Sequence, residues 1–232
     1  MNAPANTIAM MSLATPKISA AADRPFDLVV LVLPGFSHLA LHAYIEPFRI
    51  ANTVPRLPLF RWRIAGLDAR PIEGANGLSV AVDIMIDELV SGSDDRRPNQ
   101  LAIVTGEPVE QQLTPELNGF LRMMARRRVP ISEVGTATWL LARTGLLAGT
   151  RCTIHWSRLA AFAEVFNQPR ISDSLFVKDG QYSTCAGELA AFDLAVDLIG
   201  SHAGGILHRR SAAMRLSKVS AQDQTARPCR RV

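Results

Sequence analysis

The residues best suited to do chemistry in this chain lie in the segment 131–156, ISEVGTATWLLARTGLLAGTRCTIHW. A β-rich run meets Gly-Thr-Ala-Thr, and an apolar helix is expected to follow. Many α/β enzymes hold a nucleophile at such a sharp strand-to-helix turn, because the turn lifts one side chain into a pocket at the helix N-terminus. The residue at this turn is Gly135. The segment therefore predicts an active-site architecture that lacks its reactive atom.

Hydroxyl and thiol groups near the turn are weak candidates for a replacement nucleophile. Thr136 is predicted to cap the helix or to hydrogen-bond a ligand, because a Thr hydroxyl attacks only with a base in reach. Cys152 and Cys185 are predicted to be small buried residues rather than displaced nucleophiles. Cys229 lies in a basic tail, away from the predicted pocket. We expect no catalytic residue.

Histidine and tryptophan side chains offer further contacts. His155 is either a structural hydrogen-bonding group or a ligand contact, and the sequence leaves both open. Trp156 is predicted to be a partly buried, packed side chain rather than an aromatic platform for a ligand. His38 and His42 are four residues apart, a spacing that permits metal ligation, but no third ligand accompanies them. We predict neither a metal nor a cofactor.

A glycine at the turn has physical consequences of its own. It lowers the steric cost of a positive φ angle and leaves space where a thiol would stand. Backbone N–H groups at the start of the following helix remain available to a ligand. These donors and the helix dipole could hold a carboxylate, an amide or another small polar group. This description suits a sensor pocket better than a reaction centre.

The composition favours one cytoplasmic α/β domain with a sizeable core. The chain has 232 residues, of which 6% are aromatic, and its apolar runs are too short or too interrupted to cross a bilayer. The N-terminus lacks the basic and apolar regions of a signal peptide. Three cysteines without a CxxC pair are typical of a reducing compartment.

Charge is unevenly distributed along the chain. Residues 203–232 hold seven basic residues and one acid, whereas residues 26–202 hold 16 basic and 19 acidic residues. The globular part therefore shows no basic excess that would favour a nucleic-acid surface. We predict a flexible leader over residues 1–25, a ligand-sensing domain over 26–202, and a solvated basic tail or remnant linker over 203–232.

Strand and helix patterns alternate from end to end. Strands are predicted over 26–33, 60–67, 78–82, 101–105, 129–134, 175–177 and 181–185, and helices over 38–52, 114–127, 139–147, 157–166 and 188–201. This alternation predicts an α/β fold with a mostly parallel sheet between helix layers. Such folds bind ligands beyond the carboxyl ends of their strands. The loops 34–38, 105–108, 134–138 and 153–156 are therefore expected to meet at one site.

Several short motifs carry a family resemblance that covers about residues 26–210. They are LPGF at 33–36, EP at 46–47, NGL at 76–78, VTG at 104–106, GLLAG at 145–149, TIHW at 153–156 and TCAG at 184–187. On these motifs the chain resembles the N-terminal domain of GlxA-type regulators in the AraC family. That domain is similar to the PfpI-like and class I glutamine amidotransferase-like superfamily. The resemblance implies a flavodoxin-like three-layer sandwich.

The resemblance also implies a set of site residues. The catalytic Cys of the superfamily falls on Gly135, and an acid found in isocyanide hydratases falls on Ala40. His155 matches a histidine found near the nucleophile. Glu46 lies on a helix surface, with a pocket-edge or dimer role as the alternative. The predicted ligand-binding residues are Gly135, Thr136, Ala137, His155, Trp156, Gly35, Phe36 and Glu46.

The resemblance implies a non-catalytic sensing domain that is homodimeric and binds a small metabolite, either amino-acid-derived or a quaternary amine. GlxA-type regulators continue into two helix-turn-helix units, which take about 100 residues. Residues 203–232 are too few for them, so we expect no sequence-specific DNA binding from this chain alone. Two alternatives stay open. One is a PfpI-like hydrolase or isocyanide-hydratase-like enzyme with a non-standard nucleophile, and the other is a purely structural or interaction domain.

Overall fold

The computed structural model describes residues 25–53, 58–91 and 97–203. Apart from Pro25 and Ala203, the predicted leader and the predicted basic tail lie outside the described residues.

A seven-stranded sheet forms the centre of the domain, with strand order β10-β11-β7-β6-β1-β2-β5. The strands are β1 (Phe26–Val32), β2 (Phe60–Gly66), β5 (Ile84–Met85), β6 (Gln100–Val104), β7 (Ile131–Val134), β10 (Phe176–Asp179) and β11 (Tyr182–Cys185). All neighbours pair in parallel except β10, which runs antiparallel to β11. The central strands are continuous apolar runs because helices cover both of their faces. The predicted mostly parallel α/β fold is confirmed.

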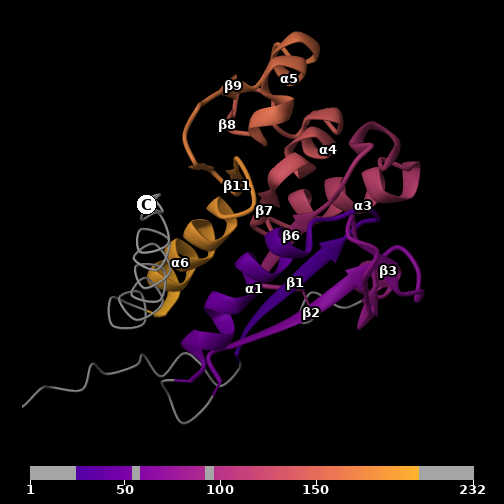
Figure 1. Ribbon diagram of the computed structural model, residues 1–232, viewed down its shortest axis with the longest axis vertical. Helices are drawn as coiled ribbons and strands as arrows, with labels where there is room; N and C mark the ends of the chain where they lie inside the picture. The colour runs from indigo at the N-terminus through magenta and orange to yellow at the C-terminus, as the bar shows by residue number, and fades with distance from the viewer. Residues whose placement is uncertain (1–24, 54–57, 92–96, 204–232) are drawn as a thin grey trace, which may run out of the picture.

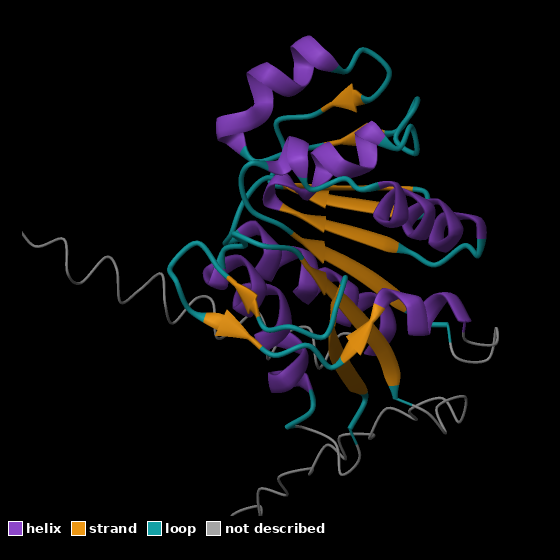
Figure 2. Ribbon diagram, turned by 90° about the vertical axis from the view of Figure 1, so that its right-hand side faces the viewer, coloured by secondary structure: helices purple, strands orange, loops and turns teal. Residues whose placement is uncertain are grey.

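Helices cover the two faces of the sheet (Figure 2). On one face, α1 (His38–Ala51) and α6 (Ala190–Ala203) pack on Leu28, Val30 and Val32. On the other, α2 (Ile86–Ser91), α3 (Pro115–Arg126) and α4 (Thr138–Arg143) pack on Val29 and Leu31. The two cores follow from the alternation of side chains along a strand.

Local signals set the helix ends. Thr114 caps α3 as its type and the following proline predict, since its hydroxyl accepts the Leu117 N–H at 3.1 Å. The predicted helix over 139–147 begins within one residue of α4 (Thr138–Arg143), but its predicted end is wrong. A 3-10 turn, η3 (Gly135–Ala137), leads directly into α4, and α4 ends at Arg143. Gly145 follows with φ of 76°, a conformation that ends a helix.

Short elements lie at the carboxyl end of the sheet. Sequence patterns predicted only some of them. A hairpin of β3 (Ile72–Glu73) and β4 (Ser79–Val80) lies beside β2, and the predicted strand 78–82 shrinks to β4. The paired strands β8 (Arg151–Cys152) and β9 (Arg170–Ile171) project at the top of Figure 1. Between them the predicted helix 157–166 divides into η4 (Trp156–Arg158) and α5 (Leu159–Val165).

Candidate functional site

The four predicted loops do meet at the carboxyl end of the sheet. The first two are in the closest contact, because Phe36 and Gly106 form an antiparallel backbone bridge. A Cβ atom at Gly106 would lie 1.7 Å from the carbonyl oxygen of Gly35. Gly35 has φ of 72° and donates its N–H to the Glu73 carbonyl at 2.9 Å. Glycine is therefore sterically required at Gly106.

The strand-to-helix turn has the geometry that the sequence predicted. Gly135 is buried and has φ of 71°, and a Cβ atom placed there would meet no described atom within 4 Å. We call this turn the elbow and the open region beside Gly135 the elbow space. Two hydrogen bonds tie the segment 153–155 to the turn. The His155 N–H donates to the Gly135 carbonyl at 3.1 Å, and the Thr138 hydroxyl donates to the Thr153 carbonyl at 2.9 Å.

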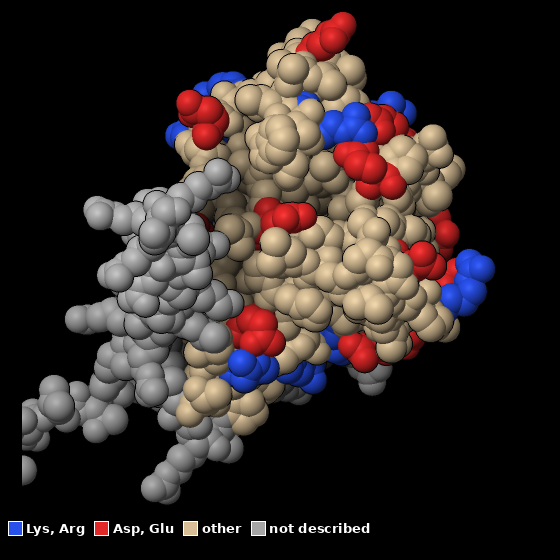
Figure 3. All heavy atoms as spheres, in the orientation of Figure 1, with Lys and Arg blue, Asp and Glu red and all other residues tan. Residues whose placement is uncertain are grey.

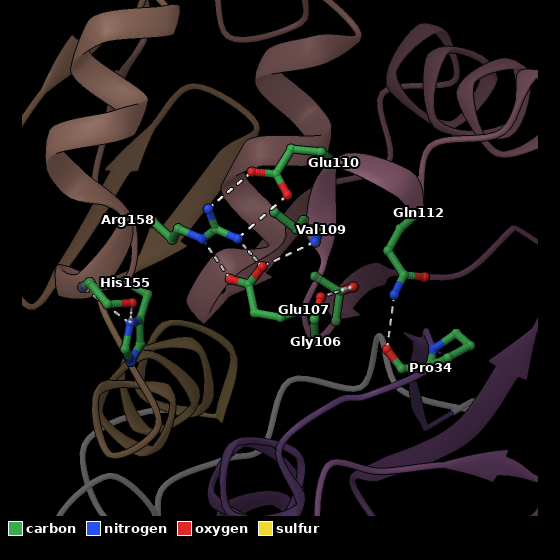
Figure 4. A network of polar contacts seen from close by, with 10 residues as sticks. Pro34, Gly106, Glu107, Val109, Glu110, Gln112, His155 and Arg158 are labelled. Atoms are coloured by element: carbon green, nitrogen blue, oxygen red, sulfur yellow. Dashed lines mark hydrogen bonds and ion pairs between the residues drawn. The ribbon is translucent and has the colours of Figure 1, made fainter.

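A three-residue ionic clamp lies beside His155 (Figure 4). The Arg158 guanidinium binds both oxygens of Glu107, with Nε to Oε1 at 2.7 Å, and reaches Glu110 Oε1 at 3.0 Å. The guanidinium also stacks over the ring of Trp139 at 5.8 Å. These contacts lower the pKa of Glu107, chiefly through the hydrogen bonds from Arg158. The clamp joins the loop after β6 to η4, which carries Trp156.

Comparison with known families decides what this architecture is. The family model described as "DJ-1/PfpI family" matches residues 29–201. This chain belongs to the DJ-1/PfpI family.

Its relatives include transcriptional regulators. The chain is 35% identical over 178 residues to the HTH-type transcriptional regulator CdhR of Pseudomonas aeruginosa. The aligned region covers 77% of this chain and 51% of CdhR. It is 26% identical over 180 residues to the HTH-type transcriptional regulator GlxA of Rhizobium meliloti, covering 78% of this chain and 54% of GlxA. The chain thus spans about half the length of these curated relatives. The match to AraC-family regulators that the motifs implied is confirmed.

A solved structure shows the same fold. The AraC family transcriptional regulator structure from Pseudomonas putida superposes with a TM-score of 0.72 at 21% identity, covering 82% of this chain and 99% of that one. This DJ-1/PfpI domain therefore has the class I glutamine amidotransferase-like architecture.

Two thiols of this DJ-1/PfpI domain are buried, as predicted. Both Cys152 and Cys185 are fully shielded from solvent. Burial raises the pKa of Cys152 to about 12 and that of Cys185 to about 11, and the nearby Glu133 adds to both shifts. A thiol with such a pKa is protonated at neutral pH and is a poor nucleophile.

A buried acid that sequence patterns missed lies two residues before the elbow. Glu133 is fully buried on β7, and neither of its carboxyl oxygens has a hydrogen-bond partner among the described residues. Burial raises its pKa well above the usual value, and the nearby Thr138 hydroxyl opposes the shift. Burial therefore favours the protonated, neutral form of Glu133. A charged residue inside an apolar strand pattern was the signal that could have found it.

The predicted site residues fall into two groups. Gly135, Thr136, Ala137 and His155 lie together at the elbow, and Gly35 lies in the loop that contacts Gly106. The side chains of Phe36 and Glu46 are placed differently. The Phe36 side chain is fully buried in the core around α1, and Glu46 pairs with Arg49 at 2.7 Å on the outer face of α1.

One side-chain prediction is wrong and another loses one of its two alternatives. Thr136 does not cap a helix, because neither η3 nor α4 receives a side-chain cap, and its predicted hydrogen bond to a ligand stays a prediction. Trp156 is not packed, because 77% of its surface is exposed beside the His155 ring. η4 holds the indole at the molecular surface. Short-range sequence patterns do not indicate whether a side chain in such a turn is exposed. His155 itself caps η4 by accepting the Ser157 N–H at 3.3 Å.

In Figure 3 acidic and basic side chains are scattered over this face of the molecule, at its margin and also near its centre. Among residues 25–53, 58–91 and 97–203, no helix is long and apolar enough to span a membrane.

Proposed function

We propose that this DJ-1/PfpI domain senses a small metabolite for an AraC-type transcriptional regulator and does not catalyse a reaction. The observation that carries the proposal is Gly135, which holds the backbone geometry of a nucleophile elbow around an open space. A ligand takes the place that a reactive side chain occupies in enzymes built on this turn.

The chemistry around the elbow supports binding over catalysis. Covalent catalysis requires a nucleophile and a group that lowers its pKa or takes its proton. The Cys152 and Cys185 thiols are buried and their pKa values are raised, so both are inert at neutral pH. No observation favours the alternative of a hydrolase or hydratase.

The relatives support the regulatory setting. CdhR and GlxA are both named as HTH-type transcriptional regulators. On that basis the proposed domain works in the cytoplasm as a homodimer, its ligand is an amino-acid derivative or a quaternary amine, and DNA is bound by a different domain. The ligand contacts are Thr136, Ala137, His155 and the exposed Trp156, whose ring is a platform at the rim of the elbow space.

A thermal-shift screen of the full chain against amino-acid derivatives and quaternary amines tests this proposal. A ligand that binds only the folded state raises Tm with its concentration. Gly135→Leu fills the elbow space and abolishes the shift. Gly180→Leu is the matched control, because Gly180 also has a positive φ, of 60°, and open space, but lies in the β10–β11 turn. A screen without any shift, or a shift that survives Gly135→Leu, refutes a sensor pocket at Gly135.

A further inference from the structure

An unpartnered hydroxyl lies deep in the domain, below the elbow. The Tyr44 side chain on α1 is fully buried, and its hydroxyl has no hydrogen-bond partner among the described residues. A buried hydroxyl without a partner loses the free energy of its bond to water, so such groups are rare and call for an explanation.

Cys185 connects this hydroxyl to the elbow space. It pairs across β11 and β7 with Val134, the residue before Gly135, and its thiol donates to the Gly187 carbonyl at 3.7 Å. The same thiol is close enough to Tyr44 to act electrostatically on the phenol. Tyr44, Cys185 and Val134 all belong to the core on the α1 and α6 face of the sheet.

Further residues lie at both ends of the line that runs from Tyr44 through Cys185 to the elbow space. At the inner end the Ser132 hydroxyl accepts the Gln100 side-chain N–H at 2.9 Å and is near enough to act on Tyr44, but it makes no hydrogen bond with the Tyr44 hydroxyl. At the outer end the His155 ring lies 3.5 Å from where a Cβ atom of Gly187 would stand. Ala40 precedes Tyr44 by one turn of α1 and is itself buried, so only a methyl group occupies that position.

We propose that Tyr44 is the inner anchor of the ligand site and donates its hydroxyl hydrogen to a neutral oxygen of the ligand. The inference rests on the proposed sensing function and names the chemistry of the ligand's buried end. That end is an uncharged carbonyl or hydroxyl oxygen. A carboxylate does not suit the position, because the polar groups identified near Tyr44 are the Ser132 hydroxyl and the Cys185 thiol, and a buried anion without a cation is costly.

The phenol is suited to this role because it stays protonated. Burial raises the pKa of Tyr44 far above its usual value, and the Ser132 hydroxyl opposes this only in part. Tyr44 is therefore a hydrogen donor at every physiological pH.

The test is a titration of the full chain with three amides, formamide, acetamide and isobutyramide, and with formate, acetate and isobutyrate as matched anions. Binding is followed by thermal shift and by protein-observed NMR. We expect an amide to bind the wild type and to bind Tyr44→Phe about tenfold more weakly. Without a probe, Tyr44→Phe has an equal or higher Tm, because it loses only an unpartnered hydroxyl.

The chain supplies a matched control in its second tyrosine. Tyr182 is partly buried, and its hydroxyl accepts the Gln181 side-chain N–H at 2.9 Å, away from the elbow. Tyr182→Phe therefore binds the amides as the wild type does. Equal amide affinity in Tyr44→Phe overturns the proposal, as does the failure of all three amides or a Tyr44-dependent binding of the anions.

A crystal structure of the wild type soaked in acetamide gives a readout that does not depend on a variant. The amide oxygen within hydrogen-bonding distance of the Tyr44 hydroxyl supports the anchor, and a water molecule there instead overturns it. The proposed sensing function has a separate outcome. A metabolite that binds wild type and Tyr44→Phe equally removes the anchor but leaves the sensor.

Discussion

Two glycines at the carboxyl end of the same sheet serve opposite purposes. Gly106 follows β6 and is crowded, with the Gly35 carbonyl 1.7 Å from the position of a Cβ atom. Gly135 follows the neighbouring strand β7 and is open, with no described atom within 4 Å of that position. The first glycine allows two loops to touch, whereas the second leaves a volume unfilled. A glycine in a sequence motif does not say which of these it does.

The difference separates scaffold from site. The loops 34–38 and 105–108 are joined by a backbone bridge and pack so closely that Gly106 has no room for a Cβ atom. The elbow keeps the hydrogen bonds that shape it while its side chain is absent. The turn at Gly135 therefore keeps its backbone framework without a side chain.

Gly106→Ala gives the largest expected effect. The added methyl group meets backbone atoms that cannot move without breaking the Phe36–Gly106 bridge. We expect a loss of more than about 4 kcal/mol in the free energy of unfolding, or no folded protein. Gly119→Ala is the control, because this glycine lies in α3 with open space, and alanine there stabilises by about 0.5–1 kcal/mol. Urea unfolding measures the stability of both variants. A Gly106→Ala variant as stable as the wild type would show that Gly106 is not crowded.

The variant Glu133→Gln tests the raised pKa of the buried acid that lies two residues before the elbow. The folded-state pKa of Glu133 lies above the unfolded value, so its stabilisation is complete below the unfolded pKa and is lost as pH rises through the folded one. Between the two pKa values the wild type loses about 1.4 kcal/mol of stability for each pH unit.

Urea unfolding from pH 5 to pH 8 measures this slope. Glu133→Gln flattens it, whereas Glu116→Gln, an exposed acid on α3, leaves it unchanged. An identical slope in wild type and Glu133→Gln would mean that Glu133 is ionised in the folded protein.

Gly135→Ala sharpens the comparison from the open side. The only expected cost is that of a positive φ in a residue with a Cβ atom, about 1–2 kcal/mol. Gly180→Ala has the same conformational cost without the elbow, so the two variants should lose equal stability. A much larger loss for Gly135→Ala would show that the elbow space is filled.

Gly135→Cys asks what the elbow does to a thiol. The introduced side chain enters the elbow space, whereas Cys152 and Cys185 are buried with pKa values of about 12 and 11. We expect a thiol reagent to label position 135 of this variant at least about tenfold faster than the two native thiols, as mapped by peptide mass spectrometry. Rapid native labelling of Cys152 or Cys185 in the folded wild type would instead revive the enzyme alternative.

The ionic clamp gives the smallest expected effect. Arg158→Gln removes the bonds to Glu107 and Glu110, and these groups are partly exposed, so the loss is about 1 kcal/mol or less at pH 7. The folded pKa of Glu107 is lowered, so this stabilisation is present above its unfolded pKa and is lost as pH falls through the folded one.

Thermal unfolding from pH 3 to pH 7 checks the clamp. Arg70→Gln, which breaks a more exposed pair with Asp68, should change Tm less than Arg158→Gln does, because solvent screens exposed ion pairs. A pH-independent difference between Arg158→Gln and wild type would assign the effect to the Trp139 contact instead.

Long, regular elements were predictable from the chain, and short or irregular ones were not. The apolar run of β1, the Thr114 cap of α3 and the alternation of strands and helices each act through neighbouring residues. The strands β3, β8 and β9 have two residues each, too few for a periodic pattern. The end of α4 depended on a positive φ at Gly145, which its residue type permits but does not require.

The candidate site divides along the same line. Sequence motifs located the elbow, the four loops and the absence of a nucleophile at Gly135. They did not locate the clamp, because Arg158 and Glu107 are 51 residues apart and meet only in the fold. They also placed Phe36 in the pocket, whereas its ring is part of the core.

The sequence by itself determined which atoms are present: a glycine at the elbow, an alanine at position 40, and two cysteines away from the turn. Only the tertiary structure decided what surrounds those atoms. It buried both thiols, exposed Trp156, raised the pKa of Glu133, and left the Tyr44 hydroxyl without a hydrogen-bond partner among the described residues. The physical reason is that desolvation and hydrogen bonding depend on segments far apart in the chain, which no local pattern encodes.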